Sequence, residues 1–248
     1  MDKDLGGDEK IMVKNKNMKA VVLAAGEGTR IKLKIPKPLV IINGLSLLER
    51  TILTFADLNV QELVIVVGYQ ADKIKGHVGN MPIIQDYKIT WVENREFHRG
   101  NGLSVLLTQD YVGDRFFLSM VDHIYDSNLF FNLLFCSGDL VCVIDSQPRF
   151  ADLGDATKVL VQDGKIQKIG KGLTEFNGLD CGMFLCSRKI FPILEETIGE
   201  GKEEWDDAKE KFAERFKLDF FDIRGALWLD VDTPKDMAKA RKLLSKRE

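Results

Sequence analysis

The chain has 248 residues, 45% of them hydrophobic, which is enough for one large α/β domain or for one domain with a small subdomain. Its net charge of −3 excludes the basic surface that a nucleic-acid-binding protein needs, so we expect no nucleic acid among its partners. The sequence contains no run of about 18 apolar residues and no signal peptide, which argues against stable membrane insertion and favours a cytoplasmic protein.

The first half of the chain alternates between short apolar runs and segments of helical periodicity. Residues 1–17 are polar and aperiodic, which predicts a disordered extension ahead of a domain over residues 18–248. Strands are predicted at 20–23, 62–67, 89–92, 116–120 and 140–144. Helices are predicted at 45–55, 71–78, 101–109 and 127–135. This alternation predicts a doubly wound, mostly parallel, Rossmann-like α/β sheet.

The pattern changes near residue 146. Two apolar runs at 157–161 and 165–169 flank Gln162-Asp163-Gly164, which predicts a small β-hairpin. We assign residues 146–182 to an insertion that carries this hairpin. The remaining elements are predicted as strands at 180–186, 219–222 and 226–229 and as helices at 189–198, 202–216 and 234–244. Thr233 followed by Pro234 is typical of the start of the last helix.

The four cysteines show no C-x-x-C spacing that would indicate a metal or redox site. They are Cys136, Cys142, Cys181 and Cys186. We expect reduced thiols in the core, with disulfides or a zinc site as the alternative.

A loop with two glycines follows the first predicted strand. It reads Leu23, Ala24, Ala25, Gly26, Glu27, Gly28, Thr29 and Arg30. Small residues let the backbone approach a ligand with its N–H groups pointing inward. Arg30 and Lys37 add fixed cations, and the prolines on both sides of Lys37 favour an extended segment there. This combination suits the phosphates of a nucleoside triphosphate. The loop lacks the third glycine of the dinucleotide fingerprint and the Gly-Lys-Ser/Thr of a Walker loop.

This loop, continued by Pro36-Lys37-Pro38-Leu39, resembles the signature of nucleotidyltransferases that join nucleoside triphosphates to sugar phosphates and related phosphate monoesters. An ordinary glycine-rich turn with solvated lysines is the alternative, but the resemblance extends over about 17 positions in fixed order. The resemblance implies that residues 23–29 bind the nucleotide and that Arg30 and Lys37 are catalytic.

Carboxylates late in two predicted strands are candidates for a metal site. Asp122 follows a buried strand, at the edge of the sheet where parallel strands present ligands. Taken alone, such an Asp is more often a turn or cap residue, but the neighbouring phosphate loop favours a ligand for Mg²⁺. His123 either bonds substrate or ends the strand. The segment from Trp228 to Pro234 resembles a late family motif that supplies a second carboxylate, with Asp230 as first choice and Asp232 as second.

A base-binding segment is predicted at residues 100–104. Gly100, Asn101 and Ser104 resemble the corresponding segment of cytidylyltransferase-like family members. A glycine lets a base lie flat on the backbone, and an Asn offers both a donor and an acceptor to a pyrimidine. The alternative is that Asn101 is a helix N-cap.

The insertion carries, in order, Pro148-Arg149-Phe150, Ala156-Thr157-Lys158, Lys168-Ile169-Gly170-Lys171 and Asp180-Cys181-Gly182. This order resembles that of cytidylyltransferases acting on inositol 1-phosphate, and the resemblance extends over nearly all of residues 19–244. It implies an acceptor site made of Arg149, Asp152, Lys158, Lys171, Glu175 and Asp180. Lys171 would also be catalytic by holding the acceptor phosphate. Phe150 and Phe176 are the segment's two aromatic residues, which favours a polyol over a quaternary ammonium. Because no membrane segment follows, we expect the free-standing form and not one fused to a membrane synthase.

The resemblance implies cytidylyl transfer from CTP to 1L-myo-inositol 1-phosphate, with Mg²⁺, giving CDP-inositol and pyrophosphate for inositol-phosphate osmolyte or phosphoinositide-type synthesis. One alternative is a transferase for phosphocholine or a sugar 1-phosphate. A second alternative is a catalytically silent, ligand-binding regulatory relative. Whether the protein forms a weak homodimer stays open.

Overall fold

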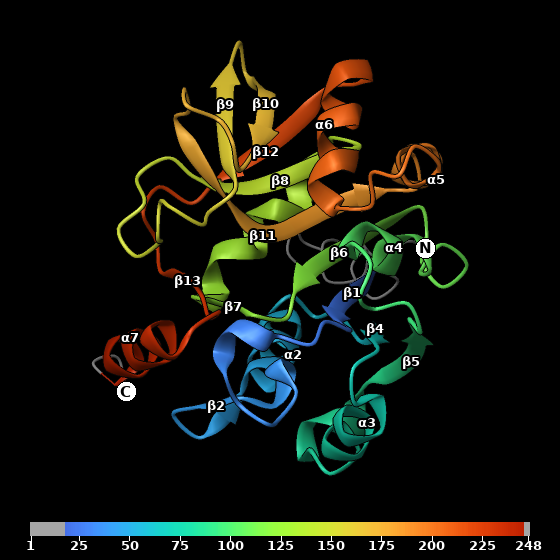
Figure 1. Ribbon diagram of the computed structural model, residues 1–248, viewed down its shortest axis with the longest axis vertical. Coiled ribbons are helices and arrows are strands. Elements are labelled where there is room, and N and C mark those ends of the chain that lie inside the picture. The colour runs from blue at the N-terminus through green and yellow to red at the C-terminus, as the bar shows by residue number, and fades with distance from the viewer. Residues whose placement is uncertain (1–17, 246–248) are drawn as a thin grey trace, which may run out of the picture.

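The computed structural model describes residues 18–245, so the extension predicted at 1–17 lies outside the described residues. One nine-stranded sheet runs through the molecule (Figure 1). Its order is β5 (Lys88–Glu93), β4 (Glu62–Val67), β1 (Lys19–Ala24), β6 (Arg115–Met120), β11 (Gly178–Ser187), β8 (Leu140–Asp145), β12 (Leu218–Asp222), β10 (Lys165–Gly170) and β9 (Lys158–Gln162). The ends of every strand of this sheet lie within one residue of a predicted strand or hairpin arm, except that β11 starts two residues early.

The sheet is parallel over β5, β4, β1 and β6, as the alternating pattern predicts. Beyond β6 it is mixed, because β11 runs antiparallel to both β6 and β8 while β12 runs parallel to β8. The predicted hairpin is present as β9 and β10, with Asp163 and Gly164 both at positive φ in its turn. It pairs with β12 and β11, so the insertion extends the main sheet.

Helices cover both faces of this sheet. One face packs against α2 (Leu47–Asp57), α3 (Ala71–Gly79), η3 (Pro82–Asp86) and η4 (Ser127–Phe135). The other packs against α4 (Asn101–Leu106), α5 (Ile190–Gly199) and α6 (Trp205–Arg215). Ala20 and Val22 of β1 point to the first face, and Val21 and Leu23 to the second. A strand buried on both sides reads as an unbroken apolar run, which is the pattern seen in the sequence.

The helices differ from their predicted bounds in a few places. α2 begins two residues late because Ser46 and Glu49 form a capping box, while residues 45–46 pair as β3 (Leu45–Ser46) with β2 (Ile41–Ile42). α4 ends at Leu106, although its pattern predicts a helix to residue 109. η4 is a 3-10 helix where the sequence predicts an α-helix.

A third, smaller core lies beside the main sheet and joins distant parts of the chain. The short strand β7 (His123–Tyr125) pairs antiparallel with β13 (Trp228–Asp230), and Asp230 lies opposite His123. Below them, α7 (Pro234–Leu244) lies near β2 (Figure 1). Apolar side chains from these elements surround Ile31, which follows the glycine loop. This core therefore holds the loop, the start of β7 and the end of β13 together.

None of the helices in residues 18–245 has the length and apolar character of a membrane span. As predicted, the four cysteines form no disulfide within the described part of the chain, and three of them are buried.

Gly182 brings β11 close to the start of β7. Its φ is +72°, and a Cβ at this position would lie 2.8 Å from the imidazole ring of His123. The register of β11 against β8 is irregular between Asp180 and Phe184, which accommodates this conformation. Only glycine satisfies both the positive φ and the close approach.

We therefore expect Gly182→Ala to lower the free energy of unfolding by about 1–3 kcal/mol. Urea denaturation measures this loss. The matched control is Gly199→Ala, at the end of α5, where a Cβ would meet nothing within 4 Å. An equal change in both variants would show that the close approach to His123 has no energetic weight.

Candidate active site

The glycine loop forms the wall of a cleft of about 340 Å³. Of the predicted nucleotide-binding residues, those lining it are Leu23, Ala24, Ala25, Gly26, Gly28, Thr29, Asn101 and Ser104. Glu27 and Gly100 are not among its lining residues. Gly28 has a φ of +64°, and a Cβ there would lie 2.6 Å from Cβ of Lys37. This glycine therefore lets the loop pack directly against the Lys37 segment.

Lys37 opens a short 3-10 helix, η2 (Lys37–Leu39), and so does not lie in the extended segment that its flanking prolines suggest. Pro36 is itself extended, and Pro38 fits because the first turn of a helix leaves backbone N–H groups unpaired. The turn directs the lysine side chain into the protein, where it is 8% exposed.

The Lys37 ammonium lies between two carboxylates. Its Nζ donates to Oδ2 of Asp122 at 2.6 Å and also to Oδ1 of Asp232. Burial alone would lower the pKa of Lys37, but the charges of Asp122 and Asp232 raise it above its usual value. Lys37 is therefore a fixed cation at neutral pH.

The three predicted catalytic cations are joined by shared carboxylates. Arg30, in η1 (Thr29–Ile31), lies 2.5 Å from Oδ2 of Asp232 and also bonds Asp155. The other oxygen of Asp155 accepts from Nζ of Lys171 at 3.3 Å. Charges thus alternate along Lys37, Asp232, Arg30, Asp155 and Lys171, which keeps three cations together without ligand present.

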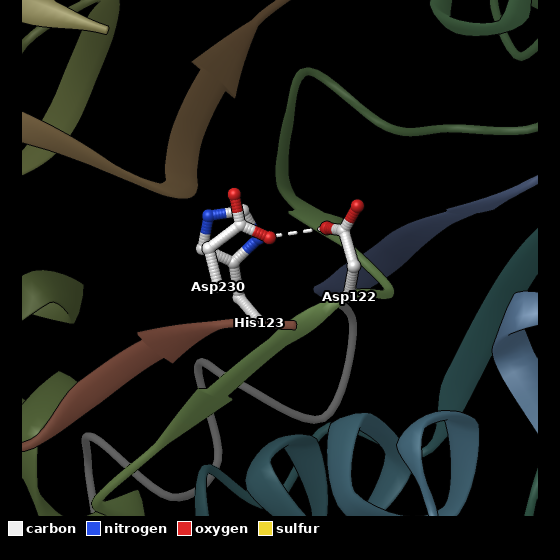
Figure 2. A group of neighbouring side chains, drawn as sticks. All are labelled: Asp122, His123 and Asp230. Carbon is white, nitrogen blue, oxygen red and sulfur yellow. Dashed lines mark hydrogen bonds and ion pairs between the residues drawn. The ribbon is translucent and has the colours of Figure 1, made fainter. Parts of the chain in front are cut away.

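Asp122, His123 and Asp230 form a group whose ligand atoms all lie within 4.8 Å of one another. Figure 2 shows Asp122 at the turn before β7 and Asp230 at the end of β13, with the His123 ring beside them. Nδ1 of His123 lies 2.8 Å from Oδ1 of Asp122. The pairing of β7 with β13 brings Asp230 beside His123, which is 107 positions earlier in the sequence.

The ionisable groups of Asp122, His123 and Asp230 shift one another's pKa values. Burial, together with the nearby Asp122 and Asp232 charges, raises the pKa of Asp230 to about 7 even though His123 lowers it. Burial also raises the pKa of Asp122, but Lys37 and His123 together hold it below its usual range. Burial lowers the pKa of His123, and Asp230 and Asp122 raise it to about 9. The carboxylates thus repel one another and depend on neighbouring positive charge.

Of the two late acids, Asp230 fits a metal ion better than Asp232. Oδ1 of Asp230 is buried and has no hydrogen-bond partner within residues 18–245. In contrast, Lys37 occupies one oxygen of Asp232 and Arg30 the other. A second group, Asp155, Asp230 and Asp232, also has the spacing of a metal site and again includes Asp230. An unpaired carboxylate oxygen is the hard ligand that a divalent cation prefers.

The predicted base-binding residues make contacts that the sequence does not indicate. Oδ1 of Asn101 accepts from the backbone N–H of Trp205 at 2.7 Å, so this amide ties α4 to α6 and does not cap its own helix. Oγ of Ser104 accepts from Asn94 at 2.9 Å. A Cβ on Gly100 would lie 2.2 Å from the carbonyl oxygen of Glu203, so its glycine serves packing.

A second, larger cleft of about 850 Å³ adjoins the first. Its walls include three of the predicted acceptor residues, Asp152, Lys171 and Asp180, together with Asp155 and other residues of the insertion. Arg149, Lys158 and Glu175 are not among its lining residues, which separates these three from the other predicted acceptor residues. Lys158 donates to the carbonyl oxygen of Lys171 at 3.2 Å and lies over the Phe176 ring. It therefore contacts the backbone of Lys171 without lining the cleft.

Several residues that line this larger cleft were not predicted as site residues from the sequence. They are Phe184, Trp205, Asp206, Lys209 and Trp228. The cleft is therefore richer in aromatic side chains than the insertion alone suggests. One signal was available, because Lys209 is four residues after Trp205 and thus shares the apolar face of α6.

The two clefts meet along a shared wall. Its residues are Arg30, Asn101, Met120, Asp122, Glu204 and Asp232. A ligand in one cleft can therefore reach a ligand in the other directly beside Asp122 and Asp232.

Several known proteins are similar to this chain over most of its length. Residues 20–208 match the MobA-like NTP transferase domain family. The bifunctional IPC transferase and DIPP synthase of Rubrobacter xylanophilus is 39% identical over 228 residues, which cover 91% of this chain and 51% of that protein. The protein of the same name from Archaeoglobus fulgidus is 36% identical over 233 residues, covering 92% and 44%. The solved inositol-1-phosphate CTP transferase from T. maritima has a TM-score of 0.81 at 27% identity, covering 93% of this chain and 96% of that one.

The chain belongs to the MobA-like NTP transferase domain family. This confirms the nucleotidyltransferase resemblance of the glycine loop and the predicted α/β fold class. The chain spans about half the length of the curated relatives it matches.

The unpaired oxygen of Asp230 generates a prediction about metal binding. We expect Asp230→Asn to weaken Mn²⁺ binding at least about 10-fold, since even residues that only support a metal ligand are worth that much. Electron paramagnetic resonance of free Mn²⁺ measures the affinity. The comparison variant is Asp232→Asn, for which we expect a smaller loss, and a larger loss in Asp232→Asn than in Asp230→Asn would reverse the assignment.

Proposed function

We propose that the protein transfers a cytidylyl group from CTP to 1L-myo-inositol 1-phosphate and releases pyrophosphate. The observation that carries this proposal is the meeting of a phosphate-loop cleft with a larger cleft beside Arg30, Asp122 and Asp232. Such an arrangement suits direct transfer between two bound substrates. The choice of substrates is supported by the T. maritima structure, an inositol-1-phosphate CTP transferase of similar length and fold.

The chain's cations suit the roles of phosphate ligands. Arg30 and the N–H groups of residues 23–29 would bind the β- and γ-phosphates of CTP. Lys37, which lines the smaller cleft and contacts Asp122 and Asp232 of the shared wall, would bridge the α-phosphate and the acceptor phosphate. Lys171, which is 59% exposed in the larger cleft, would hold the acceptor phosphate from the other side.

The reaction needs little acid–base chemistry. An oxygen of the acceptor phosphate attacks the α-phosphorus, a new P–O bond forms, and the bond from the α-phosphorus to the bridging oxygen breaks. Pyrophosphate leaves on the opposite side. Because the attacking oxygen is already an anion, the residues act by orienting two phosphates and by offsetting their mutual repulsion.

We assign the divalent cation as Mg²⁺ held by Asp122 and Asp230, where it would offset the negative charge of the nucleotide phosphates. We assign the acceptor site to Asp152, Asp155, Lys171 and Asp180 together with the α6 wall of the larger cleft. We also propose that the protein works in the cytoplasm, in keeping with its free thiols.

The substrate assignment predicts a specific pattern of pyrophosphate release. With each of four nucleoside triphosphates and with inositol 1-phosphate, glucose 1-phosphate and phosphocholine, we expect CTP with inositol 1-phosphate to react fastest. CTP should exceed UTP by about tenfold or more, because an unmatched buried polar group costs about 1–3 kcal/mol. Faster turnover with glucose 1-phosphate would show that the acceptor is a sugar phosphate. Equal rates with UTP and CTP would contradict the assignment of CTP as the nucleotide substrate.

The position of Lys37 predicts a large effect on turnover. We expect Lys37→Ala to lower kcat about 10²- to 10³-fold, the range seen when one preorganised charge-stabilising contact is lost. Lys34→Ala is the matched control, since Lys34 is an exposed lysine three residues before Lys37. If both variants turn over at the wild-type rate, Lys37 has no role in the chemistry.

A further inference from the structure

A buried group of charged residues lies on the wall of the larger cleft formed by α6 and β11. The ammonium of Lys209 donates to Oδ2 of Asp180 and lies 2.8 Å from Oδ1 of Asp206. The Lys209 side chain is 1% exposed and that of Asp180 is 4% exposed, whereas Asp206 is 32% exposed. Asp206 is thus the member of the group that a ligand in the cleft can reach.

Both oxygens of Asp206 are fixed by protein donors. Oδ1 bonds Lys209, and Oδ2 accepts from the hydroxyl of Thr157 at 2.9 Å. Each carboxylate oxygen has a second lone pair that remains available to a further donor. Burial raises the pKa of Asp206, but Lys209 and Thr157 lower it below its usual value, so it is an acceptor at neutral pH. A ligand that meets Asp206 must therefore donate hydrogen bonds.

Three aromatic rings that line the larger cleft pack against other side chains. Nζ of Lys209 lies 4.9 Å from the centre of the Phe184 ring, over its face. The Trp228 ring stacks on His123 at 5.9 Å with an interplanar angle of 4°. Trp205 meets Phe184 edge to face at 5.4 Å. Each of these three rings is 2% exposed or less, so they offer a quaternary ammonium little free aromatic surface even though they line the cleft.

We propose that Asp206, held in place by Lys209 and Thr157, accepts hydrogen bonds from ring hydroxyls of the acceptor. Because Lys209 covers the face of the Phe184 ring, that face is not available to bind a choline group. The subsite thereby selects a polyol phosphate over a phosphocholine. This proposal rests on the proposed transfer reaction. Asp206, Lys209 and Thr157 bind no phosphate in that reaction, so their role can be tested separately.

The decisive variant is Asp206→Asn, which keeps the shape of the side chain and one acceptor oxygen. We expect the KM for inositol 1-phosphate to rise at least about 10-fold, since hydrogen bonds to charged groups are the stronger ones. The KM for CTP should change less than about 2-fold, because Asp206 lies outside the nucleotide cleft. Thr157→Val, which removes one tether of Asp206, should raise the same KM by a smaller factor.

Glu214→Gln is the matched control, as Glu214 is an exposed acid on the same helix away from the cleft. Thermal unfolding of all three variants separates loss of fold from loss of binding. An unchanged KM for the acceptor in Asp206→Asn, or equal increases for acceptor and CTP, would overturn the proposal.

Phosphocholine tests the exclusion with the unmodified protein. We expect it to be neither a substrate with CTP nor a competitor of inositol 1-phosphate at concentrations about 100 times the KM of the acceptor. Competition would overturn the role of Lys209. If the unmodified protein uses a sugar 1-phosphate in place of inositol 1-phosphate, the proposed function fails. The role of Asp206 is then tested by the KM of that sugar phosphate, which should rise in Asp206→Asn; an unchanged KM would overturn it.

Discussion

The ammonium of Lys37 lies between Asp122 and Asp232, and the arrangement of the site depends on this contact. The three residues are separated by 85 and 195 positions in the sequence, so only the complete fold brings them together. A buried charge without a partner is costly, and leaving any one of the three unpaired would destabilise the other two. The ligand-free site therefore balances its own charges. In the proposed reaction, the phosphates of the nucleotide would compete with the carboxylates for Lys37 and Arg30, and the released carboxylates would favour a cation.

The small core beneath this contact explains how the site is assembled. β7 follows β6 of the main sheet, and β13 comes from the end of the chain. Their pairing fixes Asp230 opposite His123, and the N–H of Val231 donates to the carbonyl oxygen of Asp122 at 2.9 Å. Ile31 anchors the glycine loop in the same apolar cluster. The glycine loop, the group of Asp122, His123 and Asp230, and the junction of the clefts thus share one support, separate from the two large cores.

The features that the sequence predicts well are the local ones. The glycine loop, the strands of the parallel half of the sheet and the capping of α7 by Thr233 all depend on neighbouring residues. The mixed half of the sheet was not predicted because strand direction depends on pairing partners far along the chain. Lys209 and Asp206 were missed for a similar reason, since a charged helix reads as a solvated one. Asn101 contacts Trp205, 104 positions away, and no local pattern indicates this contact.

Direct transfer where the two clefts meet is the central claim of this account, and the stereochemistry at the α-phosphorus tests it. The measurement uses CTP carrying sulfur at one defined position of the α-phosphate, with inositol 1-phosphate as acceptor and ³¹P NMR of the product. A single in-line displacement inverts the configuration at phosphorus, which is the predicted result. Retention would require two displacements through a covalent nucleotidyl-enzyme, and it would contradict a direct reaction between substrates held on both sides of Lys37.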